Sequence, residues 1–253
     1  MENKNFLSCD GLDDALRSLA LVYGVEKSSI LQMYKNNWPD FLPEYDGLLA
    51  IKLDYFNDLM GEYLRVKNFE CPSVQVAFYH RARFDGTSTW FRDGLLDSVS
   101  GAKIFVEKVR GILEPHFDVD KLSGAIISNI ENRTQLEGKA IGGPYAFDWY
   151  DAAVNASGYD VPEFLCGTFS DGKGGKIYFL KDVADLLLES LSPVIIKFLD
   201  FPRDHLTYVN GLWGYVYRKR FDYEISQQTG RCSFTANGKK IEFEKLIGFL
   251  TDF

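Results

Sequence analysis

The sequence predicts an α+β protein in which an N-terminal helical segment precedes a mainly antiparallel sheet with inserted helices. Three observations lead to this class. The first 70 residues place apolar side chains at helical spacing. From residue 74 onward, short runs rich in Val, Ile, Tyr and Phe predict strands. The helices between these runs are unevenly spaced, which differs from the regular β-α alternation of a doubly wound sheet.

The N-terminal segment is expected to contain three helices. In the first, Asp10 is a plausible N-cap, two acidic residues occupy the first turn, and Gly24 ends the helix. Pro72 interrupts regular structure in the linker that follows. We therefore expect a helical segment over residues 1–70 and a second domain over 71–253. Helices are expected at about 11–23, 28–38, 46–65, 100–113, 118–130 and 182–191.

The second domain is expected to carry most of the strands. Their candidate positions are 74–80, 176–180, 193–199, 206–209, 212–225, 231–235 and 240–244. The helices expected over 100–135 would be an insertion between the first and second of these strands.

Composition limits the classes of protein that fit. With 253 residues and 46% hydrophobic side chains, the chain can bury a full core. A net charge of −8 argues against a protein that mainly coats nucleic acid, because phosphate contacts need a basic surface. The four cysteines form no C-x-x-C pair and require no disulfides, which fits a reducing compartment.

The N-terminus and the apolar runs predict a cytoplasmic protein without a membrane segment. The first 18 residues are acidic and lack the apolar core of a secretion signal. The longest apolar runs, such as PVIIKFL, have the length of a strand, far below the roughly 20 residues of a membrane span.

Two motifs can be set aside. Residues Gly167–Lys173 match G-x-x-x-x-G-K, but Gly174 replaces the Ser or Thr that would bind magnesium, and a strand follows instead of a helix. A glycine-rich hairpin turn fits this segment better. The three histidines, His80, His116 and His205, are too far apart for a local zinc motif, so no metal is expected.

The first expected strand of the second domain ends at Tyr79-His80, and Gly94-Leu95 follows after a segment long enough for one short helix. A histidine at such a strand end either packs into the structure or faces a ligand. The order resembles the first motif of ADP-ribosyltransferases, in the diphtheria-toxin-like and bacterial DNA- or RNA-targeting branches. The resemblance implies a split, mainly antiparallel sheet of ADP-ribosyltransferase type. It also implies that His80, with Tyr79 and Arg81, binds the adenosine side of NAD.

A later segment, GGPYAFDWYDAAVNASGYD, resembles the second motif of this family, a tyrosine on a strand followed by a helix of small residues. The resemblance implies that Tyr145 stacks on nicotinamide and that Asp151 opens the helix. An aromatic face can hold a pyridinium cation with about 0.5–2 kcal/mol. Tyr150 could supply a second ring.

The third motif of the family is a glutamate on a late strand, which stabilises positive charge on the ribose as nicotinamide departs. The resemblance points to Glu224, at the end of an expected strand, with Glu242 and Glu244 as alternatives. Asp222 stands two residues before Glu224, where many protein-modifying members have Glu or Gln, so the acceptor stays open.

Together the motifs imply an NAD-dependent ADP-ribosyltransferase that modifies a macromolecule, either protein or nucleic acid. The resemblance further suggests a toxin or phage-defence effector with an antitoxin or regulatory partner. Two alternatives remain: an NAD glycohydrolase, in which water is the acceptor, and a non-catalytic binding or adaptor protein on the same fold.

Overall fold

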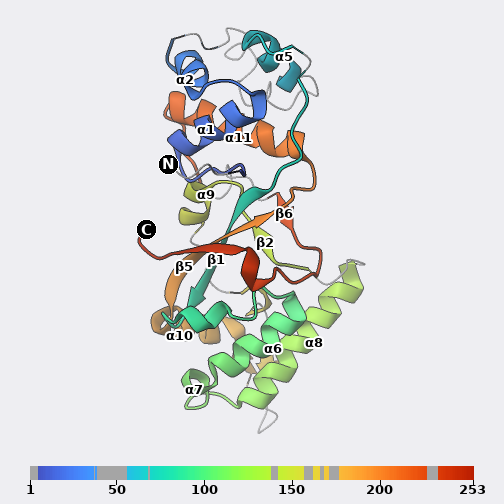
Figure 1. Ribbon diagram of the computed structural model, residues 1–253. Helices are drawn as coiled ribbons and strands as arrows, with labels where there is room; N and C mark the ends of the chain where they lie inside the picture. Colours follow the sequence, from blue (N-terminus) through green and yellow to red (C-terminus); the bar gives the residue numbers. More distant parts are fainter. Residues whose placement is uncertain are drawn as a thin grey trace. The chain divides into compact units, whose positions relative to one another are not determined.

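The computed structural model describes residues 5–36, 38, 56–67, 69–137, 142–156, 162–165, 168–170, 177–226 and 233–253. Helices and short strands alternate along these ranges (Figure 1), and the described strands form three small sheets, which confirms the α+β class. None of the helices within these ranges has the length and apolar character that a membrane span requires.

The helices are α1 (Leu12–Tyr23), α2 (Lys27–Asn36), α5 (Phe56–Tyr63), α6 (Ser98–Lys108), α7 (Arg110–Leu113), α8 (Val119–Glu137), α9 (Tyr150–Val154), α10 (Leu180–Ser190) and α11 (His205–Arg220). Short 3-10 turns are η1 (Ser88–Phe91), η3 (Glu163–Leu165) and η4 (Phe243–Lys245). The strands are β1 (Val76–Phe84), β2 (Tyr145–Ala146), β3 (Thr168–Ser170), β4 (Ile177–Phe179), β5 (Ser192–Asp200), β6 (Phe234–Thr235) and β7 (Leu246–Leu250).

The strands are ordered β1-β5-β7 in one sheet, β2-β6 in a second and β3-β4 in a third. β3 and β4 are antiparallel, with Thr168 opposite Phe179. This pairing supports the hairpin interpretation of the G-x-x-x-x-G-K segment, although its turn lies outside the described residues.

The chain divides into two compact units. Unit 1 contains Met1–Tyr79, Ala146–Asn155 and Lys197–Phe234, and unit 2 contains His80–Tyr145, Ala156–Ile196 and Thr235–Phe253. The boundary passes through β1 and β5, so both strands contribute to both units. The helices expected to form a separate segment over 1–70 share unit 1 with α11.

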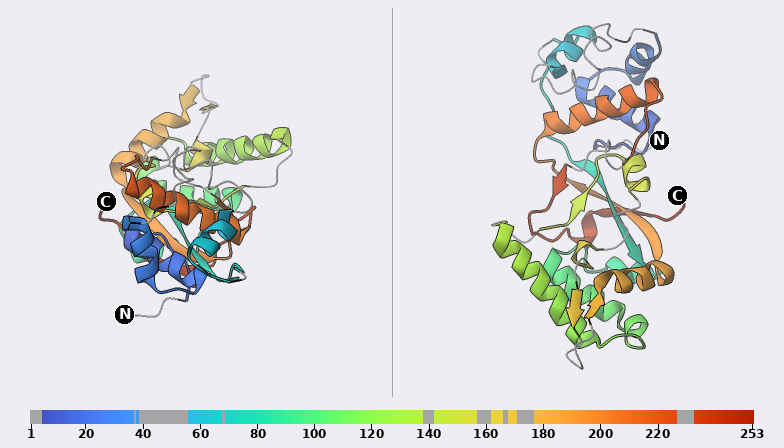
Figure 2. Two further views of the ribbon diagram at one scale, coloured as in Figure 1. Left: turned by 90° about the horizontal axis from the view of Figure 1, so that it is seen from above. Right: turned by 180° about the vertical axis from the view of Figure 1, so that it is seen from behind.

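Unit 1 is built around the packing of α11 against α1 (Figures 1 and 2). Trp213 of α11 is fully buried, and its indole Nε1 donates to the hydroxyl of Tyr23 at 3.1 Å. Phe69 also stacks on the Tyr23 ring, with 4.7 Å between ring centroids. This aromatic core joins segments that are about 190 residues apart in the sequence.

The strands expected at 206–209 and 212–225 are wrong, because residues 205–220 form α11 and residues 221–225 lie in the turn and loop after it. The helix begins where Asp204 accepts hydrogen bonds from the backbone N–H groups of Leu206 and Thr207. Residues 208–217 are almost all buried, so the helix has no polar stripe to reveal a 3.6-residue period. Its many Tyr, Val and Trp residues therefore suggested strands.

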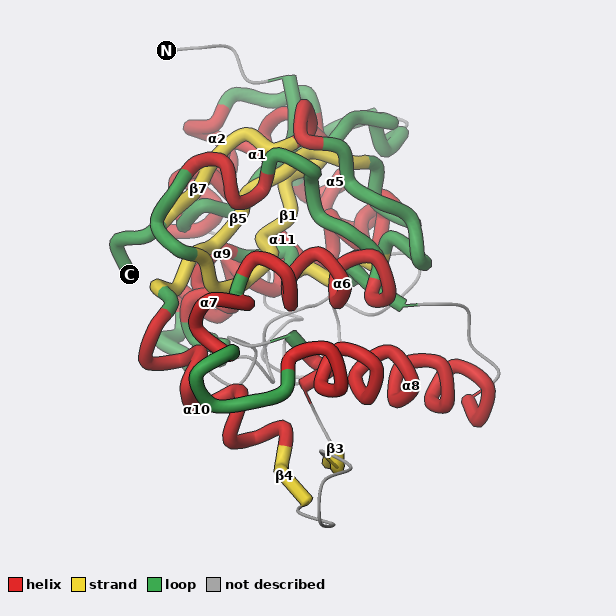
Figure 3. Tube along the Cα trace, turned by 90° about the horizontal axis from the view of Figure 1, so that it is seen from below, coloured by secondary structure: helices red, strands yellow, loops and turns green. Residues whose placement is uncertain are grey.

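In unit 2, α6 packs along α8 (Figure 3), and an ion-pair cluster ties both to α7. Arg110 bonds Glu107 at 2.7 Å, Asp120 at 2.9 Å and Glu114 at 3.4 Å.

The strand expected at 240–244 is also wrong: only Ile241 forms a bridge there, and the strand β7 begins at Leu246.

Gly94 occupies a position that other residues cannot adopt without strain. Its φ is +78°, and a Cβ built there would lie 2.0 Å from the carbonyl oxygen of Ile241. We expect Gly94→Ala to lower the free energy of unfolding by about 2–4 kcal/mol, measured by chemical denaturation. Gly111 is the control, because its helical position has open space around it. Gly111→Ala should be neutral or stabilise by up to about 1 kcal/mol, and an equal effect of both changes would contradict the expectation.

Candidate functional site

The structure brings together the first two sequence motifs at His80 and Tyr145, both in unit 2. The imidazole Nδ1 of His80, on β1, lies 2.7 Å from the carbonyl oxygen of Tyr145, on β2. A carbonyl oxygen can only accept, so Nδ1 carries the proton in this bond. In the neutral ring Nε2 is then an acceptor, which suits a hydroxyl donor such as that of a ribose.

Burial lowers the pKa of His80 below its ordinary value, and the hydrogen bond to Tyr145 only partly opposes this effect. The ring is therefore neutral near pH 7, and Nε2 keeps its free lone pair.

The pKa of His80 predicts a specific pH dependence of stability. The unfolded chain protonates this histidine near its ordinary pKa of about 6.5, above the pKa in the folded state. The contribution of His80 to the free energy of unfolding is thus fully present above about pH 6.5 and is lost as the pH falls towards the pKa of the folded state. His80→Asn should remove this component, because Asn can still donate to Tyr145 but does not titrate. Denaturation of both proteins between about pH 5 and 8 checks this, and parallel curves would contradict it.

The backbone carbonyl groups of the segment before Tyr145 accept hydrogen bonds from two other segments. The Ser98 hydroxyl, at the start of α6, donates to the carbonyl of Gly142 at 2.9 Å. From the second segment, Ala236 N donates to Pro144 O at 3.0 Å and Gly238 N to Gly143 O at 3.1 Å. The Tyr145 side chain is 46% exposed, so one part of its ring is open to a ligand.

The end of the first motif joins the same assembly. Leu95 and Ile241 exchange two backbone hydrogen bonds of 2.9 Å and 2.8 Å. The segment 236–241 therefore bonds to residues of both motifs, 143–144 and 95. Glu242 follows directly, is exposed, and pairs with Lys240 at 2.7 Å.

The three candidate glutamates are placed differently. Glu242 and Glu244 belong to unit 2 with His80 and Tyr145, whereas Glu224 belongs to unit 1. Glu224 does not end a strand as expected: it lies in the loop after α11, where its carbonyl oxygen accepts from Arg218 at 2.9 Å. Of the three candidate glutamates, Glu242 directly follows the segment 236–241, whose backbone bonds to residues of both motifs.

Arg81 is half-buried on β1, and its guanidinium carbon lies 5.1 Å from the ring centroid of Phe253. Arg81 makes other contacts as well, and the expectation that it binds NAD stays a prediction.

Tyr79 was expected to bind NAD beside His80, but its side chain does not face an open site. Successive side chains of a strand point to opposite faces, and Tyr79 points the opposite way from His80. Its side chain is fully buried in unit 1, and its hydroxyl donates to Asp10 Oδ1 at 2.7 Å. Tyr150 packs against it with 6.0 Å between ring centroids. Tyr79 belongs to the interior of unit 1, so its expected role at an open site is wrong, whereas Tyr150 is only half-buried.

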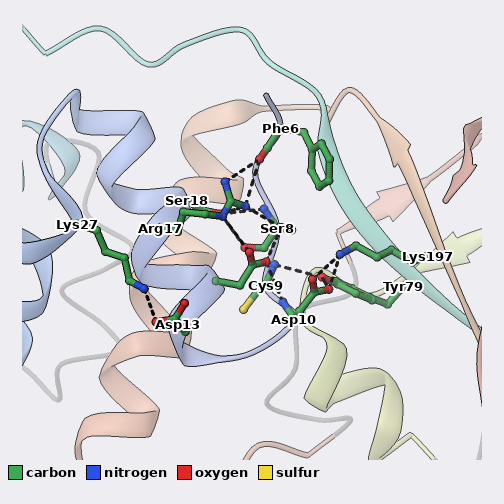
Figure 4. A network of polar contacts seen from close by, with 11 residues as sticks. Phe6, Ser8, Cys9, Asp10, Asp13, Arg17, Ser18, Lys27, Tyr79 and Lys197 are labelled. Carbon is green, nitrogen blue, oxygen red and sulfur yellow. Dashed lines mark hydrogen bonds and ion pairs between the residues drawn. The ribbon is translucent and has the colours of Figure 1, made fainter. Parts of the chain in front are cut away.

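Tyr79 is part of a polar network that the sequence did not reveal (Figure 4). The ammonium group of Lys197 on β5 lies 2.5 Å from each carboxylate oxygen of Asp10. The backbone N–H of Cys9 donates to the hydroxyl of Tyr79 at 3.2 Å. Burial, and then the charge of Asp14, raise the pKa of the Cys9 thiol well above its ordinary value, so it is not a reactive thiolate. This network holds residues 9 and 10 against β1 and β5.

A shallow cavity of about 320 Å³ in unit 1 is lined by Arg203, Asp204, Thr207 and Ser233, and includes none of the residues expected from the motifs. In the part of the chain that the structure describes, no three His, Cys, Asp or Glu side chains are grouped so that they could hold a metal ion.

Comparison with known proteins gives no assignment. No family model matches the chain, and neither the curated proteins nor the solved structures contain a significant match.

Proposed function

We propose that the protein binds NAD and transfers its ADP-ribose to a macromolecular acceptor. One observation carries this proposal: the 2.7 Å contact between His80 Nδ1 and Tyr145 O joins the two sequence motifs, 65 residues apart, that resemble those of ADP-ribosyltransferases. The proposal includes an ADP-ribosyltransferase type of fold for this α+β chain.

The chemistry of the side chains supports this function. The Nε2 atom of a neutral His80 accepts a hydrogen bond from a ribose hydroxyl on the adenosine side. The exposed face of Tyr145 stacks on the positively charged nicotinamide ring. The Arg81 guanidinium would pair with the pyrophosphate.

A carboxylate completes the proposed site. Positive charge develops on the nicotinamide ribose as the glycosidic bond breaks, and a fixed negative charge stabilises it. Glu242 is the favoured residue, because Ile241, next to it, bonds to Leu95 in the assembly that holds Tyr145. No metal ion is part of this mechanism. A role as a toxin or phage-defence effector belongs to the same proposal.

The decisive experiment mixes the pure protein with NAD and follows nicotinamide release. Release above the rate of NAD alone is expected, together with a thermal shift on binding. If the protein shows no nicotinamide release and no thermal shift, both enzymatic alternatives are wrong and a binding or adaptor role is left. Labelled NAD with cell lysate then separates the two enzymes, because only a transferase leaves label on protein or nucleic acid.

A further inference from the structure

The side chain of Tyr145 lies against a glycine three residues earlier in the chain. A Cβ added to Gly142 would lie 2.6 Å from the hydroxyl oxygen of Tyr145, and 3.5 Å and 3.6 Å from two carbons of its ring. Among the described residues, these are the three nearest atoms that the Cβ would meet. The phenol end of the ring therefore folds back onto residue 142, which only a residue without a side chain allows.

The backbone of Gly142 is itself fixed. Its carbonyl oxygen accepts from the hydroxyl of Ser98 at 2.9 Å and from the backbone N–H of Ser98 at 3.2 Å, at the start of α6. Three residues later, the carbonyl oxygen of Tyr145 lies 2.7 Å from Nδ1 of His80. The short segment that carries the ring is thus bonded at both ends, so the contact with Gly142 sets the direction of the ring.

We infer that Gly142 is a positioning residue for the Tyr145 ring, and that this position is the one that stacks on a ligand. The inference rests on the proposed function for the ligand, the nicotinamide ring of NAD. Tyr145 stays 46% exposed in this position, so the ring keeps a surface for a planar cation. Such stacking requires the cation to lie over the ring face, within about 6 Å of its centroid, and therefore depends on ring direction.

Gly142→Ala should displace the ring and change little else. No Cβ can remain 2.6 Å from an oxygen, and the hydroxyl is the far end of a side chain, so the ring turns away at a small cost in stability. The φ of Gly142 is not positive, so its backbone accepts alanine without strain. In Tyr145→Phe the hydroxyl is missing, and the nearest ring carbon, at 3.5 Å, is at an ordinary van der Waals distance from the added Cβ. The same alanine should therefore leave a phenylalanine ring in place.

The first test follows the ring without any ligand, by fluorine NMR of protein labelled with fluorotyrosine. The Tyr145 signal is the one that Tyr145→Phe removes. Gly142→Ala should shift this signal, whereas the control Gly111→Ala should leave it unchanged, because residue 111 has open space around it. An unchanged Tyr145 signal in Gly142→Ala would overturn the inference.

The second test measures the Kd for NAD by calorimetry. Gly142→Ala should raise the Kd about tenfold, through the loss of stacking, and Gly111→Ala should not change it. In the Tyr145→Phe background, the same Gly142→Ala change should alter the Kd by less than about twofold. In steady-state kinetics the KM should rise more than kcat falls, because the positive charge of the nicotinamide ring is present in the ground state and disappears as the ring departs.

The outcomes separate this inference from the proposed function. An unchanged Kd in Gly142→Ala, or an equal rise of the Kd in both backgrounds, would show that Gly142 does not act through the Tyr145 ring, and the inference would be wrong. A wild-type protein that binds no NAD would instead refute the proposed function and the stacking on nicotinamide. The fluorine signal would then still decide whether Gly142 sets the direction of the ring.

Discussion

Asp10→Asn is expected to lower the free energy of unfolding by about 2–4 kcal/mol. The Lys197 side chain is only 9% exposed, and both oxygens of Asp10 contact its ammonium group. Asparagine would remove the charge and turn an amide donor towards another donor. A buried charge without its partner is among the most destabilising changes that one substitution makes. Urea denaturation of both proteins at pH 7 measures the difference.

Asp13→Asn is the matched control, because Asp13 lies three residues further along, pairs with Lys27 and is 87% exposed. It should cost at most about 1 kcal/mol. A second comparison isolates the charge: adding Lys197→Met to Asp10→Asn removes the unpaired ammonium, so the double variant should be more stable than Asp10→Asn alone. If Asp10→Asn costs no more than Asp13→Asn, water reaches Lys197 and the ion pair does not stabilise unit 1.

The sequence correctly predicted the helices and strands whose apolar residues recur at the spacing of their buried face. α1 has one apolar face and ends at Gly24 in the left-handed conformation, as its spacing indicated. The strands expected at 74–80 and 193–199 correspond to β1 and β5, but β1 continues through His80 and the arginines after it to Phe84, so the expected strand end at His80 is wrong. The hydrogen bond between His80 and Tyr145 was not predicted from the sequence, which indicated only that both residues belong to one site, and His80 lies inside β1 instead of at its end.

Other features depend on tertiary contacts that no local pattern reports. The interior of α11 is buried all round, so its residues had the composition of strands. Lys197 was one charge in the run PVIIKFL, and only the fold shows that Asp10, 187 residues away, is its partner. Tyr79 and His80 looked equivalent in the sequence, but the alternation of β1 buries one and turns the other towards Tyr145.

The proposed chemistry predicts that Glu242→Gln lowers the rate of nicotinamide release by about 100-fold or more. Glutamine keeps the size of the side chain but removes the negative charge that stabilises the ribose in the transition state. The KM for NAD should change little, because that positive charge on the ribose is absent from the ground state. Initial rates at several NAD concentrations separate the two effects.

Glu224→Gln and Glu244→Gln are the matched controls, since all three glutamates are exposed and came from the same sequence expectation. Both variants should keep most of the activity, and all three should unfold at nearly the wild-type temperature. Loss of activity only in Glu224→Gln would show that the catalytic carboxylate comes from the loop after α11, and that Ile241 pairs with Leu95 for structural reasons alone. Full activity in all three would remove the carboxylate from the mechanism and leave His80 and Tyr145 as a binding site.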